Sequence, residues 1–362
     1  MPSKVGRRLN DPPARSAGAT GGRRLLRVGL VSVVLGVSAC SNLTHPASHR
    51  RSPSSQLTLA QARQAFRTFL PGFAELPLNF SPTAARRLTM GAELQAQLFF
   101  KGQSGAPITG LTNEAFYVPR MTGYPRWFLA AGQQGGASAA GHLFVMVQSA
   151  PSAPWRAAMA LYDIGSAAGM LHQLAATVTT DAQGYATTVP LADPSLDVTP
   201  SSMPGTYARY LNGTASRAVA RLFQAGPTTT GFIAFDRQVS RNAGRYGWLD
   251  TDHHSAAPVP VYALRLNTGG AIVIFAVDDA VRWRARTSAA LLPSQSHAAA
   301  ANYVPPAFVL SRLGISSVKA GTVITATAID RVLAFVQPKG VGFIYPLINN
   351  GAATGVQATS PR

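Results

Sequence analysis

The only cysteine in the chain, Cys40, stands directly after an apolar run, and this arrangement limits what the N-terminal residues can form. The run covers residues 28 to 39, and a basic segment with Lys4 and six arginines precedes it. A run of 12 residues is too short for a bilayer-spanning helix, which needs about 20. A basic segment followed by an apolar run and small residues is the order of a secretory leader. We therefore expect residues 1–39 to be a leader that takes no part in the fold.

The residues Val37-Ser38-Ala39-Cys40 resemble the lipobox of bacterial lipoproteins, with Val37 in place of the commoner Leu. The resemblance implies that the sulfur of Cys40 receives a diacylglycerol and that cleavage makes Cys40 the new N-terminus. Lipidation would account for a lone cysteine, because the chain holds no partner for a disulfide. The alternatives are a secreted protein in which Cys40 is incidental and a cytosolic protein with an unusual N-terminus. Export through the general or the twin-arginine route stays open, because Arg23-Arg24 precede Leu25-Leu26 but Arg27 stands where a hydrophobic residue is expected.

Composition indicates folded cores and an anionic partner. Hydrophobic residues make up 46% and charged residues 13%, which argues against disorder. The net charge is +18, and most of this surplus lies outside the leader. A basic chain held at a membrane surface is attracted to anionic lipids and wall polymers, although the same charge also favours solubility alone. The partners we expect are the membrane, through the lipid on Cys40, and an anionic envelope component or an envelope protein. Nucleic acid is excluded, because the arginines are scattered and no recognition motif is present.

Residues 41 to 56 are polar and rich in Ser and Pro, so we predict a flexible tether over 40–57. The remaining chain is long enough for two domains. We predict a first α+β domain over 58–164, a linker over 165–204, and a second α+β domain over 205–355 with an insertion at 285–318.

Each predicted domain begins with helices and continues with strands. Thr58 and Gln61 form a capping box ahead of an amphipathic helix that should end at Pro71-Gly72, and a second short helix is expected within 84–102. The second domain should begin with a helical segment at 207–225. Strands separated by Gly, Pro and Ser are expected at 114–118, 125–129, 142–147, 155–162, 232–235, 261–266, 271–277, 323–336 and 341–347, with hairpin turns at 267–270 and 338–340.

This order of a helix followed by antiparallel strands resembles the cystatin-like and nuclear-transport-factor-like cone, present twice in tandem. Two such units behind a lipobox resemble actinobacterial secreted lipoproteins of uncharacterised function. That family carries no assigned catalytic residues, so the resemblance implies no site residue other than Cys40.

Three groups of residues are candidate sites. Asp250, Asp252, His253 and His254 lie within five residues and suit a divalent metal, but adjacent side chains of an extended chain point opposite ways, and an exposed loop explains the group as well. Asp278-Asp279 could do acid–base chemistry, although solvated ion pairs with nearby arginines explain them too. Arg126-Trp127 and Trp283-Arg284 could stack as cation and ring, but half-buried aromatic residues of a sheet are commoner.

No nucleophile elbow, phosphate loop, zinc signature or dinucleotide fingerprint is present. We therefore assign no catalytic, metal or cofactor-binding residues from the sequence, and only Cys40 as a lipidation site. The function expected is a binding or interaction module, lipid-anchored on the extracytoplasmic face of the membrane. The alternative is a small-molecule binding protein or an enzyme that uses a pocket in one of the cones.

Overall fold

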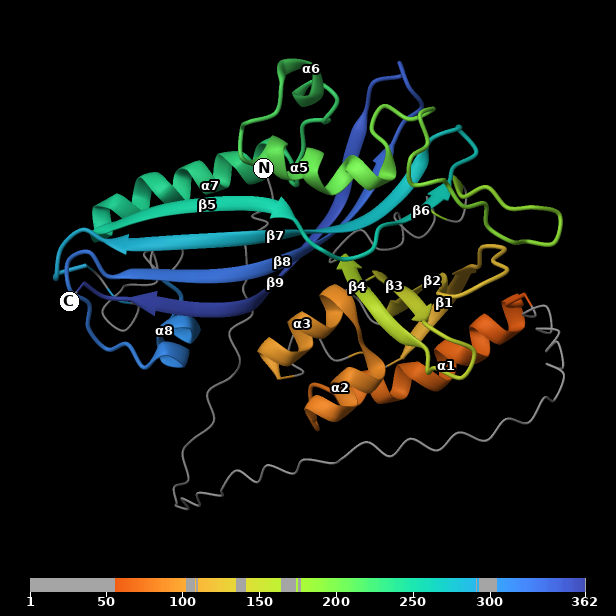
Figure 1. Ribbon diagram of the computed structural model, residues 1–362, viewed down its shortest axis with the longest axis horizontal. Coiled ribbons are helices and arrows are strands. Elements are labelled where there is room, and N and C mark those ends of the chain that lie inside the picture. The colour runs from red at the N-terminus through yellow and green to blue at the C-terminus, as the bar shows by residue number, and fades with distance from the viewer. Residues whose placement is uncertain are drawn as a thin grey trace, which may run out of the picture.

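The computed structural model describes residues 56–101, 108, 110–134, 141–163, 174, 177–290, 292 and 305–361. The predicted leader, the lipidation site Cys40 and nearly all of the predicted tether lie outside these residues. The described chain is a mixed α+β structure with two antiparallel sheets, as the sequence predicted at this level (Figure 1). No helix among the described residues is long and apolar enough to cross a bilayer.

Helix α1 (Leu59–Glu75) begins at the predicted capping box. The hydroxyl oxygen of Thr58 accepts a hydrogen bond from the Gln61 amide at 3.1 Å, and the Thr58 amide donates to Oε1 of Gln61 at 2.9 Å. The prediction that this helix ends at Pro71-Gly72 is wrong, because α1 continues to Glu75 with Pro71 inside it. Proline removes one helical hydrogen bond, but the extra turn buries Phe73 against Phe144, and this burial compensates the lost bond.

The first sheet follows two short helices. The segment predicted as one helix forms α2 (Pro82–Leu88) and α3 (Gly91–Phe100), separated at Thr89-Met90. Strands β1 (Leu111–Tyr117), β2 (Arg126–Gln134), β3 (Gly141–Gln148) and β4 (Arg156–Asp163) then pair in chain order. Side chains alternate between the two faces of a strand: Phe128 and Phe144 pack toward α1, and Leu129 and Leu143 point to the opposite face.

The second sheet has the order β5-β7-β8-β9, with β6 paired to the other end of β7. Its strands are β5 (Trp248–Ala256), β6 (Tyr262–Arg265), β7 (Ala271–Ala285), β8 (Val323–Val336) and β9 (Ile344–Thr359). Both predicted hairpin turns join antiparallel neighbours: 267–270 connects β6 to β7, and 338–340 connects β8 to β9. All pairs in this sheet are antiparallel.

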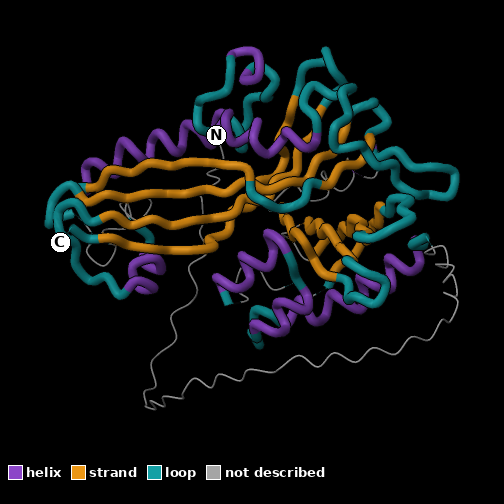
Figure 2. Tube along the Cα trace, viewed as in Figure 1, coloured by secondary structure: helices purple, strands orange, loops and turns teal. Residues whose placement is uncertain are grey.

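Helices cover both sides of the second sheet, and α3 lies between strand β4 of the first sheet and strands β8 and β9 of the second (Figure 2). Helices α5 (Met203–Leu211), α6 (Arg217–Ala220) and α7 (Thr230–Ala243) lie on the same side of the second sheet, and α8 (Ala307–Leu313) contacts β9. The prediction of a strand at 232–235 is wrong, since these residues belong to α7. A short apolar run has no distinctive period, so periodicity alone does not separate a strand from one turn of a helix.

The two sheets face each other and share one hydrophobic core. Leu129, Leu143 and Val145 of the first sheet pack with Ile272 and Leu333 of the second. The segment predicted as a linker also packs here, because Val178 and Ala186 are buried in the same core and the Ala186 amide donates to the carbonyl of Val118. The connection between the sheets is therefore part of the packed structure.

A buried ion pair joins the two halves at this interface. Nη1 of Arg331, on β8, lies 2.5 Å from Oε2 of Glu93, on α3, and both side chains are at most 2% exposed. Glu93 also accepts hydrogen bonds from the Ala160 amide at 3.1 Å and from Nε2 of Gln97 at 2.7 Å. A buried charge needs both a partner and hydrogen bonds, and Glu93 has both.

Candidate functional site

Strand β5 places its acidic and imidazole side chains alternately inside and outside. Asp250 and His254 are buried, whereas Leu249, Thr251 and His253 at the alternate positions are exposed. The sequence-based argument that neighbouring histidines point opposite ways is confirmed, but the exposed-loop interpretation of this segment is wrong. The alternation follows from strand geometry once Trp248 is buried in the core of this half.

Strand pairing brings His254 next to two carboxylates that are distant in the sequence. His254 is the cross-strand partner of Asp279 on β7, and Asp279 in turn pairs with Ala328, two residues before Asp330 on β8. One ligand atom from each of His254, Asp279 and Asp330 lies within 4.8 Å of the other two. All three residues are at most 4% exposed. We call these three residues the β5–β8 cluster.

Helix α7 adds a further carboxylate to the imidazole. Oδ1 of Asp279 lies 3.6 Å from Nδ1 of His254, and Oδ2 of Asp236, on α7, lies 3.9 Å from Nε2. The ring is therefore flanked by a carboxylate at each nitrogen. One turn further along α7, the Ser240 hydroxyl donates to Oδ2 of Asp250 at 3.2 Å. Residues four apart lie on the same face of a helix, so one face of α7 serves both contacts.

The backbone at His254 is held by the side-chain amide of Asn212, the residue that follows α5. Nδ2 of Asn212 donates to the carbonyl of His254 at 2.8 Å, and the His254 amide donates to Oδ1 of Asn212 at 2.9 Å. The ring of Phe232 lies 5.8 Å from the imidazole, centroid to centroid. Two hydrogen bonds from one side chain fix both the position and the orientation of this peptide.

A surface depression of about 500 Å³ adjoins His254, one member of the β5–β8 cluster. It lies between α5 and the end of β5, and its lining includes Arg209, Asn212, Asp252, His253 and His254. Four of the 14 acidic residues of the chain, Asp236, Asp250, Asp279 and Asp330, lie on this face of the sheet or on the helix above it. For a chain with a net charge of +18, this is a local concentration of negative charge.

The other residues weighed from the sequence do not form sites together. Asp278 and Asp279 point to opposite faces of β7, and burial raises the pKa of the Asp278 carboxyl. The guanidinium of Arg126 stacks on the ring of Tyr124, at 4.3 Å from its centroid, while Trp127 contacts Tyr262. Trp283 is buried in the core around α8 and β9. Asp330 was not singled out in the sequence, and no local pattern marks it.

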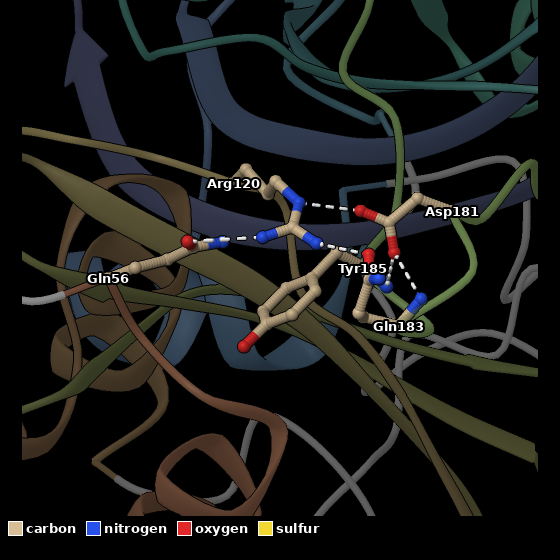
Figure 3. Close-up of polar contacts among 5 residues, drawn as sticks. All are labelled: Gln56, Arg120, Asp181, Gln183 and Tyr185. Atoms are coloured by element: carbon tan, nitrogen blue, oxygen red, sulfur yellow. Dashed lines mark hydrogen bonds and ion pairs between the residues drawn. The ribbon is translucent and has the colours of Figure 1, made fainter.

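A second polar group lies where the described chain begins (Figure 3). The guanidinium of Arg120 donates to Asp181 at 2.5 Å, to Gln183 at 2.8 Å and to Gln56 at 3.2 Å, and it stacks on the ring of Tyr185. The hydrogen bond from Arg120 lowers the pKa of the Asp181 carboxyl. Each guanidinium nitrogen has a partner within the protein, so this group ties the start of the fold to the segment between the sheets.

Comparison with known proteins places the chain in a family. The family described as Domain of unknown function (DUF8094) matches residues 95–333, which include the first sheet, the second sheet up to residue 333 of β8, and all three residues of the β5–β8 cluster. The chain belongs to the DUF8094 family. An uncharacterised lipoprotein of Streptomyces coelicolor is 28% identical over 166 residues, which is 46% of this chain and 46% of the lipoprotein. The chain therefore matches less than half the length of this relative.

Proposed function

We propose that this member of the DUF8094 family is a lipoprotein that acts outside the cytoplasm, held to the membrane by acyl chains on Cys40. The observation that carries the proposal is the lipobox-like Val37–Cys40 behind a basic, apolar leader, in a chain with a lipoprotein relative. Several acyl chains are needed for durable anchoring, because each buried methylene contributes only about 0.8 kcal/mol. The folded part, from Gln56 onward, then stands at the end of a short polar segment.

Each sheet with its helices is proposed to be a cystatin-like or nuclear-transport-factor-like unit. In support, α1 packs on the four-stranded sheet, and α5 and α7 lie on one side of the five-stranded sheet. The folded part is proposed to be a binding module for an anionic envelope component or an envelope protein. The net positive charge of the chain supports an anionic partner.

Binding of a small polar ligand is a second candidate function. The depression beside His254 favours it, because polar side chains from α5 and β5 converge there. Among the described residues, this depression and the β5–β8 cluster are the features that a simple adhesive module would not need.

The test of the anchor is the chemistry of Cys40. In the native host, Cys40→Ala should move the protein from the membrane fraction to the medium or leave the leader uncut. Ser41→Ala, one residue further on, is the matched control and should leave both properties unchanged. Mass spectrometry of the native N-terminal peptide should find an acylated Cys40. A native chain that begins at Met1 with an unmodified thiol at Cys40 would refute the proposal.

A further inference from the structure

We propose that His254, Asp279 and Asp330 bind one divalent transition-metal cation, with Asp236 as a carboxylate of the outer shell. An imidazole nitrogen together with carboxylate oxygens is a donor set that suits zinc and its first-row neighbours. The three side chains come from three adjacent strands of one sheet, so the framework that positions them is rigid. The proposal is independent of the lipid anchor.

The distances fit a metal more closely than they fit direct pairing. Zinc bonds of about 2.0–2.2 Å in tetrahedral geometry place neighbouring ligand atoms about 3.3–3.6 Å apart. Nδ1 of His254 and Oδ1 of Asp279 are separated by 3.6 Å, which is close to this value and longer than an ordinary hydrogen bond. The ligand atoms of all three residues lie within 4.8 Å of one another, so the three side chains converge on one point where a cation would be held.

The outer contacts are those of a metal-ligating histidine. Such a residue generally offers its second ring nitrogen to a carboxylate or a carbonyl. With Nδ1 toward the cluster, Nε2 of His254 faces Asp236 at 3.9 Å. The two hydrogen bonds between Asn212 and the backbone of His254 fix this residue where Nδ1 faces Asp279 and Nε2 faces Asp236.

Strand β9 leaves room for the third ligand. Gly351 is the cross-strand partner of Asp330, and a Cβ atom at this position would lie 2.5 Å from Oδ1 of Asp330. Glycine therefore lets the carboxylate occupy space that any other residue would fill. The depression lined by Asp252 and His254 reaches one of the three ligands from the surface.

Charge compensation is the physical reason for a cation at this place. Desolvating each ionised carboxylate costs several kcal/mol, and Asp279 and Asp330 are buried side by side. A divalent cation supplies two positive charges and would be bound by all three members of the cluster at once.

The experiment is a titration of the purified full chain with Zn²⁺ after dialysis against a chelator. Isothermal titration calorimetry should show one equivalent bound, with Mg²⁺ much weaker because it prefers oxygen donors alone. The chain offers matched controls, because each inner ligand has a neighbour on the opposite face. Asp279→Asn and His254→Gln should weaken Zn²⁺ binding by about 100-fold or more, by removing a direct ligand, while Asp278→Asn and His253→Gln should leave it unchanged.

Circular dichroism should establish that each variant is folded. If Asp279→Asn fails to fold, Asp236→Asn replaces it, since an outer-shell change should weaken binding about 10- to 100-fold. A visible Co²⁺ spectrum that disappears in His254→Gln and persists in His253→Gln would independently support the assignment. Absence of stoichiometric Zn²⁺ binding, or equal affinity in Asp279→Asn and Asp278→Asn, would overturn it.

Discussion

Replacing Arg331 with Met should lower the free energy of unfolding by about 3–5 kcal/mol, the range for a buried charge that loses its partner. This range for buried pairs applies because the side chains of Glu93 and Arg331 are 2% and 1% exposed at the interface of the two sheets. After the substitution, Glu93 would retain hydrogen bonds from Ala160 and Gln97, neither of which supplies a positive charge. The hydrogen bonds that remain should therefore not compensate the loss of the Arg331 charge.

The double variant Glu93→Gln/Arg331→Met separates the charge from the packing. Removing both charges leaves no buried ion, so this variant should be more stable than Arg331→Met alone. Arg284→Met, at an exposed position on β7, is the control and should change stability by no more than about 0.5 kcal/mol. Urea unfolding followed by tryptophan fluorescence reports on both halves, because Trp127 and Trp155 lie in or beside the first sheet and Trp248 and Trp283 lie in the second. A loss below about 1 kcal/mol in Arg331→Met, or a double variant with the summed loss of both single variants, would refute this reasoning.

Two further predictions concern stability alone. Burial lowers the pKa of His142 to about 4, so between about pH 6.5 and 4 the unfolded chain binds a proton that the folded chain excludes. The free energy of unfolding should therefore fall by up to about 3 kcal/mol as the pH falls through this window. Urea unfolding at a series of pH values should show this pH dependence, and it should be weaker in His142→Gln. Gly247→Ala should destabilise the fold by about 1–3 kcal/mol, because the residue has a φ of 81° and its Cβ would lie 2.9 Å from Cα of Ala290. The control Gly244→Ala has a helical backbone and open space around its Cβ, so a thermal melt should show no loss.

Local patterns were sufficient for much of the fold. The capping box at Thr58 and Gln61 depends on side chains three residues apart, and β8 was predicted over the residues it occupies, 323–336, because it is a long apolar run between turns. Local patterns failed where tertiary packing decides the outcome. Pro71 remains inside α1 because Phe73 is buried beyond it, and 232–235 is helical because α7 lies over β5 (Figure 1).

The β5–β8 cluster could not be assembled from the sequence, because it depends on register. His254 and Asp279 were each noticed, but in separate groups, and which of Asp278 and Asp279 points inward is decided by the pairing of β7 with β8. A shift of one residue would exchange their faces. Asp330 is further still along the chain, and in the sequence it is a single acidic residue within an apolar run.

The partners in the Glu93–Arg331 pair are 238 residues apart. During synthesis, α3 and the first sheet are therefore complete long before the cation that neutralises Glu93 exists. Until β8 has emerged, the apolar face of the first sheet that packs against the second is exposed, and the Glu93 carboxylate beside it has no positively charged partner from β8. A chain interrupted before residue 331 should consequently be a substrate for chaperones and proteases, because the second sheet that covers the apolar face of its N-terminal half is incomplete.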